Sequence, residues 1–229
     1  MSFLLFIVAC ETEEPMIIKK DEPINTTIDE TVEEANEQED EQKIIISLAD
    51  ENVQLNLNKI PILAEYLSLA KNKTIAIQQL NLIPLQTSEQ TIYLLEFACQ
   101  NNHCSYLLID ENEKHSSILL ADLAKFDDAF FSPDESLLAI KFRRNQDNSL
   151  SMGHVTIISL DQWKTVPLMN ESEHSHVLHY RSPILSLTWI DDTTISVQTP
   201  RIPEFNDEGI QILDSDEGLT TDIIFQIEK

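Results

Sequence analysis

The fold of this 229-residue chain is decided by one stretch, FSPDESLLA at Phe131–Ala139. Its centre, Ser132-Pro133-Asp134-Glu135, has the chemistry of a type I turn, because proline supplies the required φ at the second position. Apolar residues precede and follow this turn, over Ala129–Phe131 and Leu137–Phe142. The stretch therefore predicts two antiparallel strands joined by a tight turn.

The same strand-turn-strand pattern recurs on both sides of this stretch. The expected strands are Thr91–Ala98, Ser105–Ile109 and Ser117–Leu120 in a first segment, Ala129–Phe131, Leu137–Phe142, His154–Leu160 and Thr165–Met169 in a second, and Ile184–Trp189, Thr194–Gln198, Gly209–Leu213 and Asp222–Ile227 in a third. The pattern predicts a mainly β fold of antiparallel sheets.

Two more strands and two short helices are expected ahead of these segments. Lys43–Leu48 and Val53–Leu57 have the pattern of strands, joined by a turn at Ala49–Asn52. A helix should begin at Pro61 and end near Asn72, with one apolar face formed by Ile62, Leu63, Tyr66, Leu67 and Ala70. A second helix is expected over Thr74–Leu80. The fold class is mainly β, or α+β with one or two short helices near residues 60–80.

The stretch Phe131–Ala139 resembles the turn FSPDGxxLA of β-propeller blades of the WD-repeat and TolB type, with Glu135 in place of the usual glycine. Trp189–Ile195 is similar to a degenerate copy of this turn. The chain offers about two and a half such blades, whereas a closed ring takes at least four. We expect a blade-like open stack or partial propeller. An unrelated sheet or sandwich with Ser-Pro-Asp turns is the alternative.

The N-terminus carries an apolar run, Phe3–Ala9, that ends at Cys10. This run is too short to span a bilayer, which takes about 20 residues in a helix. Ile7-Val8-Ala9-Cys10 resembles the lipobox of bacterial lipoproteins, and the chain as a whole is similar to small surface lipoproteins of Gram-positive bacteria. The resemblance implies a signal peptide over residues 1–9, and a Cys10 diacylated with chains such as palmitate.

That resemblance places the protein on the extracellular face of the cell membrane, held by its lipid. Basic residues usually precede the apolar run of such a signal. Here the run is preceded only by Met1 and Ser2, neither of which is basic, as expected if the true start codon lies upstream. The alternative is a short N-terminal strand with a buried thiol in a cytoplasmic protein.

Residues 10–42 have the composition of a tether. Between Asp21 and Glu41 there are ten acidic residues and no basic one, and there is no aromatic residue from Glu11 to Gln42. Such a segment buries too little apolar surface to offset the entropy of ordering it. We expect a disordered acidic tether over 10–42, followed by a mainly β domain over 43–229.

Composition excludes several classes of function. Asp and Glu outnumber Lys and Arg by 40 to 15, a net charge of −25, and there are only three glycines. Phosphate-binding loops need clustered glycines, and nucleic-acid binding draws its affinity from Lys and Arg. We expect no nucleic acid and no cofactor. The expected partner is a protein or a cell-wall component, with membrane contact only through the lipid anchor.

Cys99 and Cys104 bracket Gln100, Asn101, Asn102 and His103 at the tip of a predicted hairpin. Opposed residues that flank such a loop lie near the separation that a disulfide needs. In an exported protein we expect this disulfide to form and to tighten a binding loop over Gln100–His103. Two free thiols are one alternative, and half a metal site of Cys99, His103 and Cys104 is the other.

Three histidines, His174, His176 and His179, stand close together. In an extended chain the first two would face the same way, as two ligands of one metal do. A solvated loop is the simpler interpretation, so no metal site is predicted. Asp214–Gly218 resembles the start of a calcium loop, but Phe225 stands where the bidentate Glu belongs, so a hairpin turn is expected there.

Two acidic pairs, Asp127-Asp128 and Asp191-Asp192, are expected in turns, because neighbours on a strand face opposite ways. Lys141 and Arg143 share a face of one strand, where they should form salt bridges to acidic residues of a neighbouring strand.

No serine stands in a nucleophile elbow, and no Cys–His pair has an orienting third group. The expected function is a non-enzymatic binding or accessory module anchored to the membrane. The alternatives are a hydrolase or other enzyme with its site in the inter-blade loops, and a cytoplasmic interaction protein if the N-terminus is part of the core.

Overall fold

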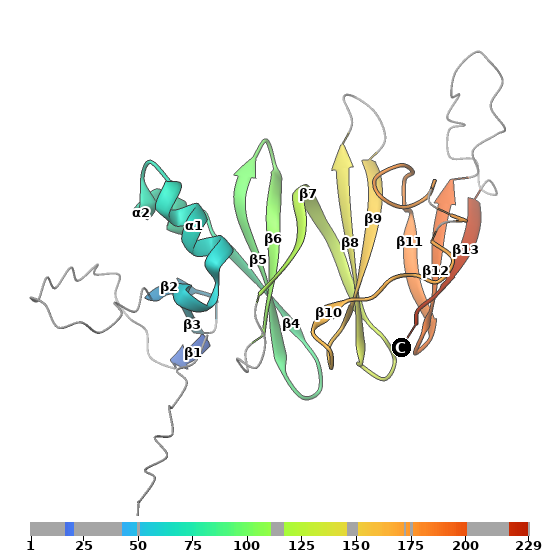
Figure 1. The fold of residues 1–229 in the computed structure, drawn as a ribbon, viewed down its shortest axis with the longest axis horizontal. Coiled ribbons are helices and arrows are strands. Elements are labelled where there is room, and N and C mark those ends of the chain that lie inside the picture. The colour runs from blue at the N-terminus through green and yellow to red at the C-terminus, as the bar shows by residue number, and fades with distance from the viewer. Residues whose placement is uncertain are drawn as a thin grey trace, which may run out of the picture.

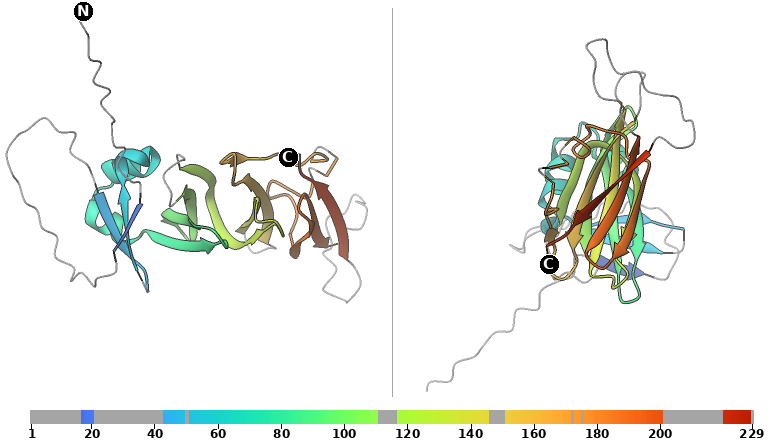
Figure 2. Two further views of the ribbon diagram at one scale, coloured as in Figure 1. Left: turned by 90° about the horizontal axis from the view of Figure 1, so that it is seen from below. Right: turned by 90° about the vertical axis from the view of Figure 1, so that its right-hand side faces the viewer.

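The computed structural model describes residues 17–20, 43–49, 51–110, 117–145, 151–171, 173–174, 176–200 and 220–228. Of these residues, 59% lie in strands and 12% in helices, which confirms the mainly β class. The strands form three antiparallel sheets that follow one another along the molecule (Figure 1, Figure 2). Over the described residues they make an open stack and no closed ring.

Five of the sequence predictions lie outside the described residues. They concern the signal peptide over residues 1–9, lipidation of Cys10, the tether apart from residues 17–20, the strand Gly209–Leu213 and the turn Asp214–Gly218.

The first sheet has the strand order β1-β3-β2, with bounds Ile17–Lys20, Asn52–Asn56 and Lys43–Ser47. The turn between β2 and β3 lies where the pattern predicts it and is closed by a 2.8 Å hydrogen bond from the Leu48 N–H to the Glu51 carbonyl. Strand β1 corrects the tether prediction for four residues, because its backbone pairs with β3. Ile17 and Ile18 are β-branched, which favours a strand.

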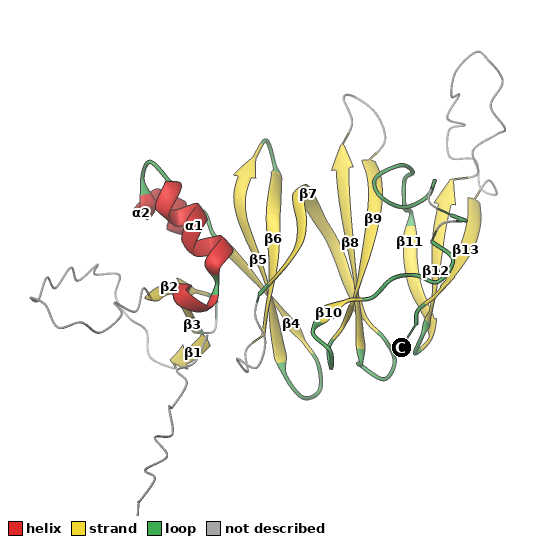
Figure 3. Ribbon diagram, in the orientation of Figure 1, coloured by secondary structure: helices red, strands yellow, loops and turns green. Residues whose placement is uncertain are grey.

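Three short helical segments cover this sheet (Figure 3), namely η1 at Leu57–Lys59, α1 at Pro61–Leu69 and α2 at Lys73–Gln78. Pro61 occupies the start of α1, as predicted. Asn72 caps α2, because its side-chain oxygen accepts a 3.1 Å hydrogen bond from the Ile75 N–H. Leu63 and Leu67 are the buried residues of α1, whereas Ile62 is 38% exposed. Ile62 was expected on the buried face, but a helix this short buries only a narrow stripe.

The second sheet has the order β10-β9-β8-β7-β6-β5-β4. Its strands are β4 at Asn81–Gln86, β5 at Thr91–Gln100, β6 at His103–Asp110, β7 at Ile118–Phe131, β8 at Leu137–Asn145, β9 at Ser151–Ser159 and β10 at Lys164–Thr165. The pattern predicts separate strands at Ser117–Leu120 and Ala129–Phe131, but both belong to the single long β7. The strand expected over Thr165–Met169 is reduced to β10.

Strand β7 bends in the middle, and this bend folds the sheet onto itself. Its first half pairs with β6 and its second half with β8. At the bend Leu123 has a positive φ of 47°, which is rare for a residue other than glycine. The Arg144 guanidinium donates hydrogen bonds to the carbonyl oxygens of Asp122 and Leu123. Strands β4–β6 therefore lie over β8 and β9.

Both faces of β5 are buried, which explains its unbroken apolar run. Ile92 and Leu94 belong to the core shared with β8 and β9, whereas Tyr93 and Leu95 belong to the core shared with the helices and the first sheet. Strands that are covered on both sides lose the alternation of polar and apolar residues. The stack is thus held together by apolar layers between successive sheets.

The third sheet, β11-β12-β13 at Ser186–Asp191, Thr194–Pro200 and Thr220–Gln226, ends the described stack. Its inner face, which includes Ile195 and Phe225, packs against β8 and β9. Its outer face carries mostly polar residues such as Thr188 and Ser196, which suits contact with water. The Trp189 indole N–H donates a 3.0 Å hydrogen bond to the Phe130 carbonyl and so ties this sheet to β7.

Candidate binding site at the disulfide hairpin

The tip of the β5–β6 hairpin carries the predicted disulfide, between Cys99 and Cys104. The loop is shorter than the four residues expected, because Gln100 pairs with His103 and leaves a two-residue turn. Its residues Asn101 and Asn102 have φ values of 49° and 60°. Asparagine tolerates this left-handed region, which two-residue hairpin turns require. Both asparagines are exposed, so the tip presents two side-chain amides on a cross-linked hairpin.

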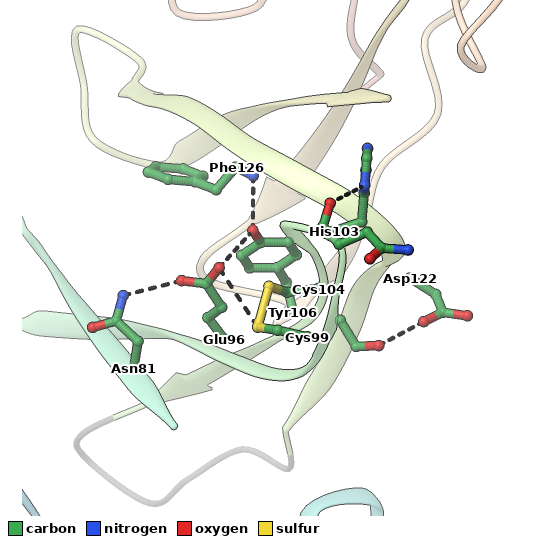
Figure 4. Close-up of a disulfide and its surroundings, with 10 residues drawn as sticks. Asn81, Glu96, Cys99, His103, Cys104, Tyr106, Asp122 and Phe126 are labelled. Carbon is green, nitrogen blue, oxygen red and sulfur yellow. Dashed lines mark hydrogen bonds between the residues drawn. A yellow bond between two sulfur atoms is a disulfide. The ribbon is translucent and has the colours of Figure 1, made fainter. Parts of the chain in front are cut away.

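A bulge in β5 places Glu96 beside the disulfide. Strict alternation would put residues 96 and 99 on opposite faces of the strand. The register shifts between Phe97 and Gln100, and Ala98 has a φ of 52°. This extra residue turns Cys99 back to the face that carries Glu96. An Oε1 atom of Glu96 lies 3.9 Å from the Cys99 sulfur (Figure 4).

The Glu96 carboxylate is fixed by hydrogen bonds from two neighbouring strands (Figure 4). The Tyr106 hydroxyl donates to Oε1 at 3.2 Å, and the Asn81 amide donates to Oε2 at 3.0 Å. The same hydroxyl accepts a 2.9 Å hydrogen bond from the Phe126 N–H. Burial, to which the nearby Glu96 adds, raises the pKa of Tyr106 to about 12. Tyr106 is therefore a proton donor at neutral pH.

A hollow of about 580 Å³ opens beside this group of residues. Its walls combine the disulfide and the two turn asparagines with charges of both signs, from Glu96 and Lys125, and with the apolar side chains of Ile83 and Phe126. Convergent polar groups beside apolar ones are typical of a surface that orients a ligand.

His103 does not join the cysteines. Its Nδ1 atom lies 3.1 Å from the Asn101 carbonyl oxygen, and Figure 4 shows its ring on the opposite side of the disulfide from Glu96. The triple of Cys99, His103 and Cys104 is therefore wrong as a ligand set. The acidic neighbour that does approach the sulfurs, Glu96, was missed, because only the bulge brings it to that face.

The three clustered histidines lie in a series of turns, as the solvated-loop interpretation expects. The rings of His174 and His176 are 6.1 Å apart, and His179 forms a short contact with Glu171. Among the described residues, the one group of three metal-ligating side chains with converging atoms is Glu96, Cys99 and Cys104. The histidine candidates therefore do not converge on a common site.

His154, which no sequence pattern singled out, lies beneath this histidine segment. Its ring stacks on His179 with centroids 5.0 Å apart, and its Nδ1 accepts a hydrogen bond from the His179 N–H. Tyr180 packs on the same ring and also on the guanidinium of Arg144. Burial, with His179 and Arg144 adding to it, lowers the pKa of His154 from 6.5 to about 4. His154 is therefore neutral at physiological pH.

A second hollow, of about 610 Å³, lies at the other end of the sheet and is lined by several carboxylates. Two of them hold turns together. Asp134 accepts hydrogen bonds from Ser132 and Ser136, and Glu135 accepts two from Ser88. These hydrogen bonds from Ser88 lower the pKa of Glu135. The predicted Ser-Pro-Asp-Glu turn is thus confirmed, with Glu135 at a φ of 55° where the blade turn has glycine.

The basic pair on β8 bridges to the neighbouring strand, as predicted. The Lys141 ammonium lies 2.9 Å from Asp127, and Arg143 contacts the same carboxylate at 3.5 Å. Asp127 and Asp128 are wrong as turn residues, because they lie within β7, where the register shifts between Phe126 and Asp128. Asp191 does act in a turn, where its carboxylate accepts a hydrogen bond from the Thr193 N–H.

Comparison with known protein families, with curated proteins and with solved structures found no match to this chain. Among the described residues, no helix is both long enough and apolar enough to cross a membrane.

Proposed function

We propose that this protein is a lipoprotein of the outer face of the cell membrane that binds a partner, a protein or a cell-wall component, through the Cys99–Cys104 hairpin. Cys10 supplies the anchor in this proposal, and the stack of sheets supports the hairpin above the membrane. The anchoring rests on the likeness of Ile7–Cys10 to a lipobox, and the binding site rests on the geometry of the hairpin.

The observation that carries the binding site is a covalent cross-link at an exposed hairpin tip. Cys104 is buried, but Cys99 and both turn asparagines are exposed, and the cross-link encloses a loop so short that it stabilises the fold by only about 2 kcal/mol. What it does achieve is rigidity at the tip. A rigid loop loses less conformational entropy on binding, and this loss is a main cost of association.

The chemistry of the hollow indicates a polar ligand with some apolar surface. Asn101 and Asn102 each offer an amide donor and an amide acceptor, and Glu96 and Lys125 add one charge of each sign. Ile83 and Phe126 provide apolar contact. A peptide, or a glycan-peptide of the cell wall, combines these features.

Photo-crosslinking tests the binding site. Benzoylphenylalanine is placed at Asn102 in the full chain in its native cells, with Thr188 on the exposed face of β11 as the control position. We expect a discrete adduct from position 102 and none from position 188. Digestion of the adduct with a protease or with a cell-wall hydrolase identifies the class of partner. Equal crosslinking at both positions, or none at either, would contradict a site at the hairpin.

A further inference from the structure

The position of Glu96 is not explained by the disulfide that it faces. The ligand-type atoms of Glu96, Cys99 and Cys104 all lie within 4.8 Å of one another. A disulfide sulfur carries neither a proton nor a charge, so it offers a carboxylate no hydrogen bond and no ionic attraction. The side chain is nevertheless held there by Tyr106 and Asn81.

This arrangement is the one that metal-ligating carboxylates show. A ligand carboxylate is normally oriented by hydrogen bonds from outside the metal site, and here the Tyr106 hydroxyl and the Asn81 amide occupy those positions. The orienting hydroxyl is itself fixed by the Phe126 N–H. All three residues also line the hollow of about 580 Å³, and Cys99 is exposed although Cys104 is buried, so an ion can enter from the side of Cys99.

We propose that the reduced hairpin is a zinc site, with the Cys99 and Cys104 thiolates and the Glu96 carboxylate as three ligands and a fourth position open to solvent. Zinc binds thiolate sulfur and carboxylate oxygen in tetrahedral sites, and an open fourth position is usual when a site is not purely structural. Two thiolates and a carboxylate this close would repel one another strongly without a cation, so the metal-free thiols stay protonated. A divalent ion compensates the charge of both thiolates and leaves the group with a net charge of −1.

The two states of the hairpin are linked by thiol–disulfide exchange. Two molecules of a thiol reductant are consumed. The thiolate of the first molecule attacks one sulfur of the Cys99–Cys104 bond and forms a mixed disulfide with the chain. The second molecule attacks this mixed disulfide, and the two reductant molecules leave joined as their own disulfide. The chain gains two electrons and two protons as two S–H groups. Zinc then displaces both thiol protons to solvent, so disulfide and metal exclude one another.

The test is a zinc titration of the full chain in both redox states, with a phosphine as the reductant and a chromogenic chelator as the competitor. We expect one tightly bound zinc in the reduced protein and none in the oxidised protein. With Co²⁺ in place of zinc, the reduced protein should show thiolate-to-metal charge-transfer absorption. Zinc bound at the histidines would be present in both redox states, so equal binding before and after reduction would overturn the proposal.

Variants identify the ligands. Glu96→Gln keeps the size of the side chain and removes its charge, and we expect its zinc affinity to fall at least tenfold. Glu65→Gln makes the same change on an exposed position of α1 and should leave the affinity unchanged. Cys99→Ser, at an exposed position, should abolish binding, and a thermal melt of each reduced variant verifies folding. Equal zinc affinities of Glu96→Gln and Glu65→Gln would show that Glu96 is not a ligand and would overturn the proposed site.

Discussion

The carboxylate of Glu135 accepts two hydrogen bonds from Ser88, one from the backbone N–H at 2.9 Å and one from the hydroxyl at 2.6 Å. Ser88 lies in the turn between β4 and β5, and Glu135 lies in the turn between β7 and β8. The contact therefore joins the two halves of the folded sheet at one end. The contact also explains why a glutamate is found at a positive φ. The glycine usual at that position has no side chain to accept hydrogen bonds from Ser88.

The Ser88–Glu135 contact should make stability depend on pH. The hydrogen bonds lower the pKa of Glu135 in the folded protein from its ordinary value of 4.5. Their contribution is therefore complete above pH 4.5 and is lost as the pH falls through the lower folded pKa. We expect Glu135→Gln to lower the thermal midpoint at pH 7 and to have no effect in strong acid. Ser88→Ala should cause only part of this loss, because its backbone N–H still donates to Glu135. The double variant should be less stable than wild type by less than the sum of the two single losses.

His154 should make the protein labile to mild acid. Its pKa is about 4 in the folded protein, against 6.5 when exposed, so the unfolded chain binds the additional proton between these values. The free energy of unfolding should fall by up to about 3 kcal/mol as the pH drops from 6.5 to 4. His154→Gln should flatten this part of the profile in denaturation experiments. A profile that is unchanged in the variant would mean that other groups cause the acid sensitivity.

The neighbouring arginines Arg143 and Arg144 should differ sharply in importance. Arg144 satisfies two carbonyl oxygens at the β7 bend and stacks on Tyr180 at 4.0 Å. Arg144→Ala should cost about 2 kcal/mol, which lowers the thermal midpoint by about 4–8 °C. Within the described residues, the Arg143 side chain forms an exposed ion pair with Asp127, so Arg143→Ala should cost less than about 1 kcal/mol. Similar losses in both variants would contradict this account of the bend.

The sequence predicted the strands well because their signals are local. The β-branched run of β2, the alternation in β3, the apolar runs of β5 and β6, and the Ser-Pro-Asp turn each depend on a few adjacent residues. The bend of β7 and the bulge of β5 were missed because Leu123 and Ala98 adopt positive φ without being glycine. Only tertiary contacts impose that conformation, as the contacts of Arg144 do at Leu123. The position of Glu96 depends on such a bulge, so no residue spacing could reveal it.

Lipidation of Cys10 remains a prediction from the lipobox resemblance. Two acyl chains on one cysteine suffice for stable membrane attachment, where a single chain is marginal. In native cells the protein should incorporate labelled palmitate and sediment with membranes. Cys10→Ser should lose the label and appear in the soluble fraction. Recovery of an intact, unmodified Met1–Cys10 peptide by mass spectrometry would contradict lipidation.

Removal of the disulfide should weaken binding more than folding. Cys99 is exposed and Cys104 is buried, so the suitable variant is Cys99→Ser with Cys104→Ala, which avoids burying a hydroxyl. The enclosed loop is short, so the free energy of unfolding should fall by no more than about 2 kcal/mol in urea denaturation. Photo-crosslinking from position 102 should fall severalfold, because the two turn positions, 101 and 102, lose the disulfide that fixes them. A variant that fails to fold would show that the disulfide supports the core. Unchanged crosslinking would show that rigidity of the tip does not matter for binding.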